Sequence, residues 1–96
     1  MKTDDLLKSK REEILRLAAR RGVINIRVFG SAANGELKAD SDIDFLVEME
    51  PDRSLFDLGG LLMDLQNLLG RDVDIVTEKA LHWYIRDRVL SEAKPL

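Results

Sequence analysis

Three stretches of the sequence carry apolar residues at helical spacing, where positions three, four and seven apart share one face. The first covers residues 4–21. The second opens at Ser54 with a capping-box variant, Ser-x-x-Asp, and closes at Gly70. The third covers about residues 78–92, with Thr77 as a suitable N-cap. We predict a helix in each stretch, packed through its apolar positions: Leu7, Ile14, Leu15 and Ala18; Leu55, Leu58, Leu62, Leu65 and Leu69; Leu81, Ile85 and Val89.

Strands are predicted between these helices, where apolar residues alternate or run together. They cover residues 23–29, 42–49 and 72–76. The second strand is apolar on both faces after Asp44, as a central strand is. The resulting order, α-β-β-α-β-α, predicts an α/β (α+β) fold in which helices pack on a small mixed β-sheet. From a length of 96 residues we expect one domain spanning residues 1–96.

The candidate chemistry lies between the first two predicted strands. Asp42 and Asp44 are two residues apart in an extended segment, so their side chains project to the same face. Neighbouring carboxylates repel and raise each other's pKa unless a cation lies between them. Oxygen ligands of this kind suit Mg²⁺. Upstream, Gly30 permits a close backbone approach to a ligand, and Ser31 offers a hydroxyl and an N–H to a phosphate oxygen.

Other interpretations of this segment fit less well. The alternating acids of residues 40–44 begin like a calcium-binding EF-hand loop, but Phe45 stands where that loop needs Gly and Pro51 where it needs Glu. A P-loop is excluded because no Gly-Lys-Ser/Thr follows Gly30. A solvated acidic turn is the remaining alternative, and the Gly-Ser pair at this spacing disfavours it.

The spacing of Gly30-Ser31, ten residues, then Asp42-x-Asp44 resembles the nucleotidyltransferase signature of the DNA polymerase β superfamily. The surrounding residues narrow the resemblance to the minimal nucleotidyltransferases, which are often paired with HEPN toxins. The resemblance implies that Gly30 and Ser31 hold the phosphates of a nucleotide and that Asp42 and Asp44 hold the metal ions. It covers nearly the whole chain and supports the predicted fold.

The resemblance also implies a third carboxylate. In the family this acid lies in an Asp-apolar-Val context, which Asp74 matches, so we expect Asp74 to complete the catalytic and metal-binding set and leave Asp72 as a surface acid. One position departs from the family, because Asn34 stands where Arg is common. Asn cannot replace a guanidinium on a phosphate, so we expect reduced triphosphate affinity or activity.

The implied activity is Mg²⁺-dependent transfer of AMP, or another nucleoside monophosphate, from a nucleoside triphosphate such as ATP to a hydroxyl on a partner protein. Two Mg²⁺ ions about 3.5–4 Å apart would take part. The implied partner is a HEPN-type toxin, with this chain as its antitoxin. Because the chain has no further domain for the base or the acceptor, we expect a homodimer or a hetero-complex. Two alternatives stay open: a non-catalytic antitoxin that masks its partner, and nucleotidyl transfer to a small molecule.

Composition limits the other function classes. The net charge is −3, and setting three site acids aside leaves about zero, so no basic face is available to track DNA or RNA. The absence of cysteine excludes disulfides, thiolate metal sites and a Cys nucleophile. No apolar run approaches the ~20 residues of a membrane span, and no signal-peptide pattern occurs at the N-terminus. We therefore expect a cytoplasmic protein that binds neither DNA nor membranes.

Overall fold

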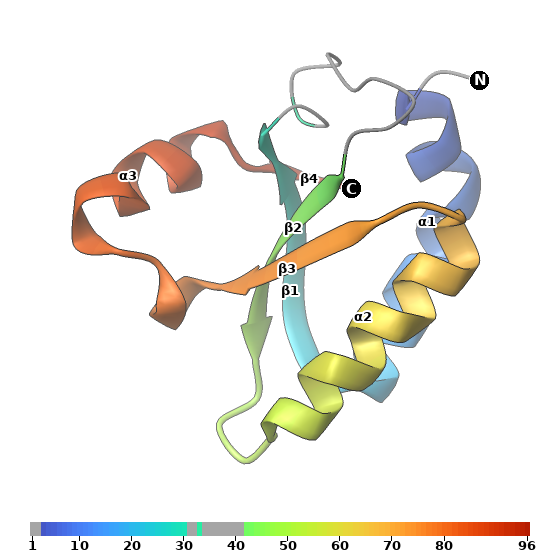
Figure 1. Cartoon of the computed structure of the whole chain (residues 1–96), viewed down its shortest axis with the longest axis horizontal. Coiled ribbons are helices and arrows are strands. Elements are labelled where there is room, and N and C mark those ends of the chain that lie inside the picture. Colours follow the sequence, from blue (N-terminus) through green and yellow to red (C-terminus); the bar gives the residue numbers. More distant parts are fainter. Residues whose placement is uncertain (1–2, 31–32, 34–41) are drawn as a thin grey trace.

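The computed structural model describes residues 3–30, 33 and 42–96, which form helices around a central sheet (Figure 1). Its elements are α1 (Thr3–Arg20), β1 (Val23–Phe29), β2 (Ile43–Met49), α2 (Leu55–Leu69), β3 (Val73–Thr77), the 3-10 turn η2 (Glu78–Ala80), α3 (Trp83–Glu92) and β4 (Lys94–Pro95). The predicted order and the α/β class are confirmed. None of the helices in the described part of the chain is long and apolar enough to cross a membrane.

The sheet is mixed, with strand order β3-β2-β1-β4. The neighbours β1 and β2 are antiparallel, and β2 and β3 are parallel because α2 carries the chain back between them. The edge strand β4 pairs antiparallel with β1, placing Lys94 opposite Val28. This strand was not predicted from the sequence. It consists of two residues, and Pro95 is tolerated there because an edge strand has one unpaired side.

The core lies between the sheet and two helices. Figure 1 shows α1 and α2 on one side of the sheet, with α3 on the other side. Alternation along β2 sends Ile43, Phe45 and Val47 into this core, where they are fully buried. The opposite face of β2 is also covered at Leu46, which is 1% exposed. Burial on both faces confirms the prediction that this strand is central.

Helix α2 begins and ends as its sequence predicts. Ser54 accepts a hydrogen bond from the Phe56 N–H at 3.2 Å, while Asp57 accepts one from the Ser54 N–H at 3.2 Å, which completes the capping box. Gly70 ends the helix in the left-handed conformation. The predicted apolar stripe is wrong at its first position, because Leu55 is 83% exposed and Leu61 is buried instead.

The last helix differs most from expectation. The sequence predicts a helix from residue 78 capped by Thr77, but β3 continues to Thr77, which pairs with Val47 on β2. Thr77 makes no side-chain cap hydrogen bond, and Leu81 is extended after η2, so α3 starts only at Trp83. The strand pairing therefore overrides the local capping preference. None of the residues in α3 is buried.

Candidate nucleotide and metal site

Two adjacent strands place carboxylates opposite each other. The parallel register of β2 and β3 pairs Asp44 directly with Asp74, so both side chains project from the same face of the sheet. Asp42 lies just before β2 and has the same parity as Asp44, while Ile43 between them is buried on the other face. The structure thus brings the three predicted acids to one end and one face of the sheet.

Asp72 has a different position from Asp74. It precedes β3, and its carbonyl oxygen accepts a hydrogen bond from the Ile43 N–H at 3.1 Å. Asp72 nevertheless has the same parity as Asp74, two residues away, and both side chains are exposed. The choice of Asp74 over Asp72 as the third acid stays a prediction from the family resemblance.

The surroundings of the Asp44 carboxylate disfavour its ionised form. Burial raises the pKa of the Asp44 carboxyl above its ordinary value, and the negative charges of Asp74 and Asp42 raise it further. Asp44 is half-buried, whereas Asp42 and Asp74 are exposed. A cation bound between the three carboxylates would favour the ionised form of each. It would therefore counteract the rise in the Asp44 pKa that the charges of Asp74 and Asp42 cause.

The donor set suits a hard divalent cation, because all three candidates offer carboxylate oxygens. Within residues 3–30, 33 and 42–96, however, no three His, Cys, Asp or Glu side chains lie close enough together to form a ready-made metal cluster. The assignment of Asp42, Asp44 and Asp74 as metal ligands therefore stays a prediction, based on shared face, register and charge.

Gly30 lies directly against the side chain of Asp44. It follows β1 with a φ of 67°, in the left-handed region, and a Cβ atom there would come within 2.7 Å of the Asp44 Oδ2 atom. Any other residue would be strained and would push the carboxylate aside. The Ala33 N–H donates to the Gly30 carbonyl oxygen at 3.1 Å and closes a turn after the strand. The predicted phosphate ligand Ser31 and the departure at Asn34 lie outside the described residues.

Sequence reasoning missed one neighbour of this turn. Through β4 the far end of the chain returns to β1, and Lys94 lies opposite Val28, two residues before Gly30. No local signal in the sequence marks this pairing, since a two-residue strand has no periodicity. Only the contact between the two ends of the chain reveals it.

Comparison with known proteins identifies a family and several relatives. The chain matches the family described as "Nucleotidyltransferase domain" over residues 7–96. The protein adenylyltransferase MntA of Thermococcus cleftensis is 45% identical over 76 residues, which are 79% of this chain and 77% of that protein. A solved structure that bears the provisional name of minimal nucleotidyltransferase is 47% identical with a TM-score of 0.90, covering 100% of this chain and 97% of that chain.

A more distant structure shares the fold. A toxin–antitoxin crystallised with AMP-PNP superposes with a TM-score of 0.75 at 24% identity, over 88% of this chain and 69% of that chain. These matches confirm the resemblance drawn from the Gly-Ser and Asp-x-Asp segment, as well as the predicted fold.

Proposed function

Since the chain belongs to the family of nucleotidyltransferase domains, we propose that it transfers a nucleotidyl group, most simply AMP from ATP, to a hydroxyl on a partner protein. The observation that carries this proposal is the pairing of Asp44 with Asp74, with Gly30 leaving space against the Asp44 carboxylate. A nucleotide bound against Gly30 would have its phosphates next to the acids. In-line attack on the α-phosphorus then depends on how these groups orient the triphosphate.

The proposed reaction exchanges one phosphorus–oxygen bond for another. The acceptor oxygen bonds to the α-phosphorus, the bond to the β-phosphate oxygen breaks, and pyrophosphate leaves. Asp42, Asp44 and Asp74 would hold Mg²⁺, which when bound supplies charge neutralisation and lowers the pKa of the acceptor hydroxyl. We assign the acceptor proton to Asp74, which is exposed and can return it to water.

A protein acceptor fits this chain better than a nucleic acid. With a net charge of −3, the chain carries no excess of positive charge for the counterion release on which nucleic-acid binding depends. A tyrosine hydroxyl, with an unperturbed pKa near 10, is easier to activate than an aliphatic alcohol. The name of the Thermococcus cleftensis relative, protein adenylyltransferase, supports the same choice. The toxin–antitoxin neighbour supports a toxin as the partner. We propose that this toxin is of the HEPN type, as the resemblance to the minimal nucleotidyltransferases implies.

Exposed apolar side chains support the need for a partner or a second copy. Leu55 and Phe56 at the start of α2 are 83% and 91% exposed, and Trp83 and Tyr84 at the start of α3 are 85% and 66% exposed. Large apolar groups at the surface in such number are typical of interaction sites. We therefore propose that the chain works in a hetero-complex or a homodimer.

A second candidate function is partner masking without catalysis. Asn34, in place of the Arg common in the family, favours this alternative, because the amide carries no charge for a triphosphate. The retention of Asp42, Asp44 and Asp74 favours catalysis. The two functions give different results in one labelling experiment.

That experiment uses ATP labelled on the α-phosphate, Mg²⁺, the purified chain, and the product of the neighbouring gene or, separately, RNA. The proposal predicts label on the protein partner for the unaltered chain and for Asp52→Asn, an exposed acid beyond the far end of β2. Label should be lost with Asp44→Asn. Label on RNA alone would overturn the choice of acceptor, and label on neither with a stable complex would favour masking.

A further inference from the structure

Helix α2 carries apolar residues on two opposite faces. Its inner face packs on the core through three buried residues, Leu61, Leu65 and Leu69. On the opposite side Phe56, Gly59 and Met63 share one face, because they are three, four and seven residues apart, and all three are exposed. Leu55, also exposed, lies one turn before Gly59. We call these four residues the outer face of α2. A surface helix normally has polar residues there, so this face has the composition of one that is covered.

The outer face of α2 carries no charge. The helix contains two charged residues, Asp57 and Asp64, and both are already paired within the chain. Asp57 lies 3.4 Å from an Arg53 nitrogen, and Asp64 lies 3.1 Å from the Arg21 Nε atom. A net charge of −3 makes two copies of the chain repel each other elsewhere on their surfaces. An uncharged apolar face is therefore where two copies can meet.

Gly59 has no explanation within the chain. Glycine is the least favourable residue in a helix interior after proline. At Gly60 the chain gives a reason, because an added Cβ atom would lie 2.5 Å from the Arg21 guanidinium group. At Gly59 an added Cβ atom would meet nothing within 4 Å beyond its own part of the helix, and its φ is not positive. The close approach of another backbone would explain this residue.

The outer face of α2 is complementary to itself. In a two-fold pair of antiparallel helices, residues at equal distances before and after the axis meet each other. An axis midway between Gly59 and Gly60 pairs Phe56 of one copy with Met63 of the other, and Gly59 with Gly60. The contact of a methionine sulfur with an aromatic ring is favourable. Small residues at the crossing allow the helix axes to approach toward the short end of the usual ~8–10 Å.

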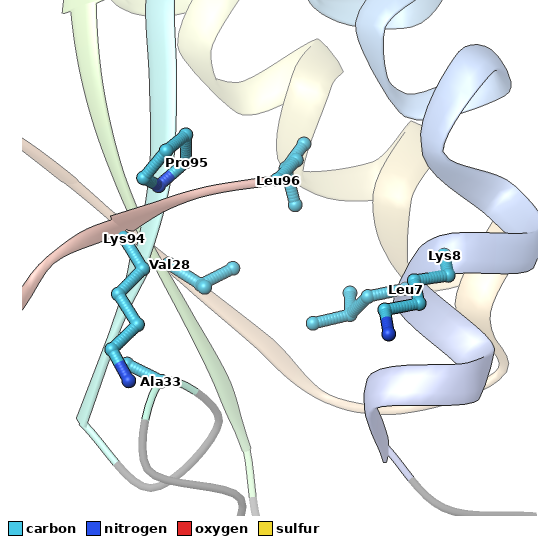
Figure 2. Close-up of a pocket in the computed structure, with 7 residues that line it drawn as sticks. All are labelled: Leu7, Lys8, Val28, Ala33, Lys94, Pro95 and Leu96. Atoms are coloured by element: carbon cyan, nitrogen blue, oxygen red, sulfur yellow. The ribbon is translucent and has the colours of Figure 1, made fainter.

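The apolar pocket beside β4 is less suited to a second copy. It is lined by residues of α1, β1 and β4, together with Ala33, and has a volume of about 120 Å³ (Figure 2). Its lining includes Lys8 and Lys94 beside the apolar Leu7 and Val28. Two copies meeting through this pocket would bring lysines of like charge together, which disfavours the contact. The outer face of α2 has no such conflict.

We propose that the outer face of α2 binds the same face of a second copy, in an antiparallel two-fold pair that crosses at Gly59 and Gly60. This inference goes beyond the proposed function and does not rest on it. Helix α2 has 15 residues and is about 22 Å long, which is short for the ~800 Å² per partner of a standard interface. We therefore expect a dissociation constant in the micromolar range.

Such a dimer would leave the candidate site accessible. Asp44 and Asp74 project from the face of the sheet opposite the core, whereas α1 and α2 cover the core side (Figure 1). The two copies would meet through their core-side helices, and each set of acids would face away from the contact. A nucleotide and a different partner protein could then bind each copy.

The test is sedimentation equilibrium of the purified chain over a series of concentrations. Met63→Glu should weaken the dimer at least about tenfold, because it buries an unpaired carboxylate against Phe56 of the other copy. Tyr84→Glu is the matched control. Tyr84 is 66% exposed and Met63 is 65% exposed, but Tyr84 lies on α3, on the other side of the sheet. Tyr84→Glu should dimerise like the unaltered chain.

A second variant separates association from folding. Gly59→Gln replaces glycine with a good helix former at a position with free space, so it should raise the thermal unfolding midpoint at concentrations where the chain is monomeric. The same side chain would hold the two helices apart, so it should weaken the dimer at least about tenfold. Opposite effects on folding and association are expected only if Gly59 lies at the crossing.

The contrary outcomes are distinct. A chain that stays monomeric over the whole series overturns the proposal. Equal dimer affinity in Met63→Glu and Tyr84→Glu also overturns it, because the contact would then lie elsewhere. If the chain alone is monomeric and Met63→Glu instead abolishes a complex with the product of the neighbouring gene, the outer face of α2 belongs to that protein and not to a second copy. None of these results alters the proposed nucleotidyl transfer, which the labelling experiment tests separately.

Discussion

Replacing Gly30 with Ala should destabilise the fold by more than the backbone alone explains. An L-residue in the left-handed region costs about 1–2 kcal/mol, and Gly30 has a φ of 67°. The new Cβ would also come within 2.7 Å of the Asp44 Oδ2 atom. Moving a side chain off its preferred rotamer costs about 0.5–1.5 kcal/mol. The two effects together give about 1.5–3.5 kcal/mol for Gly30→Ala.

Gly70 provides a matched control. Its φ is 65°, and a Cβ atom there would meet nothing within 4 Å. Gly70→Ala should therefore cost only the backbone part, about 1–2 kcal/mol. A third variant, Gly30→Ala combined with Asp44→Ala, removes the colliding carboxylate. In that background the extra cost at residue 30 should disappear.

Urea unfolding of these variants measures the free energies directly. Each kcal/mol should also lower the melting temperature by roughly 4–8 °C for a domain of this size. If Gly30→Ala is no more destabilising than Gly70→Ala, the close contact with Asp44 does not exist in solution. If neither substitution destabilises the chain, the left-handed assignments are wrong as well.

Three further substitutions test separate parts of the account. Asp44→Asn should stabilise the nucleotide-free chain near pH 7. Because the pKa of Asp44 is raised in the folded state, its ionisation lowers the free energy of unfolding at pH values above that pKa. Urea unfolding should show the gain vanish below pH ~3.9, the ordinary aspartate pKa. Arg27→Met should lower the free energy of unfolding in urea by about 1–3 kcal/mol, because it leaves the half-buried Glu78 carboxylate without its partner. The double variant Arg27→Met, Glu78→Gln should recover part of this loss. Ser54→Ala should cost about 1 kcal/mol through loss of the α2 cap, and an unchanged unfolding midpoint would contradict that role.

The sequence predicts well where local signals agree. Helix α2 has a capping box at Ser54, leucines at helical spacing and a terminal Gly70, and its bounds follow from these. Strand β2 shows its central place through apolar residues on both faces. Both elements are determined by residues close together in the chain, which a sequence pattern records.

Prediction fails where a distant contact decides the structure. Thr77 has the chemistry of a helix cap, yet its pairing with Val47 keeps it in a strand. Leu55 fits the leucine spacing, yet it lies at the exposed start of α2. The pairing of Lys94 with Val28 joins two ends of the chain, and no local periodicity reports it.

The candidate site divides in the same way. The shared face of Asp42 and Asp44 follows from alternation along one strand, so the sequence alone predicts it. The pairing of Asp44 with Asp74 depends on the register between two strands, and only the family resemblance suggested it. The space that Gly30 leaves for the Asp44 carboxylate is a three-dimensional fact that the motif does not state.

The central claim is that these acids form a metal-dependent nucleotide site, and calorimetric titration of ATP with and without Mg²⁺ tests it most directly. Asp74→Asn and Asp72→Asn are a matched pair for this titration, because they remove the same charge from positions two residues apart at one strand. The account predicts Mg²⁺-dependent binding that persists in Asp72→Asn and is lost in Asp74→Asn and Asp44→Asn. Binding that ignores Mg²⁺, or that survives unchanged in all three variants, would contradict it.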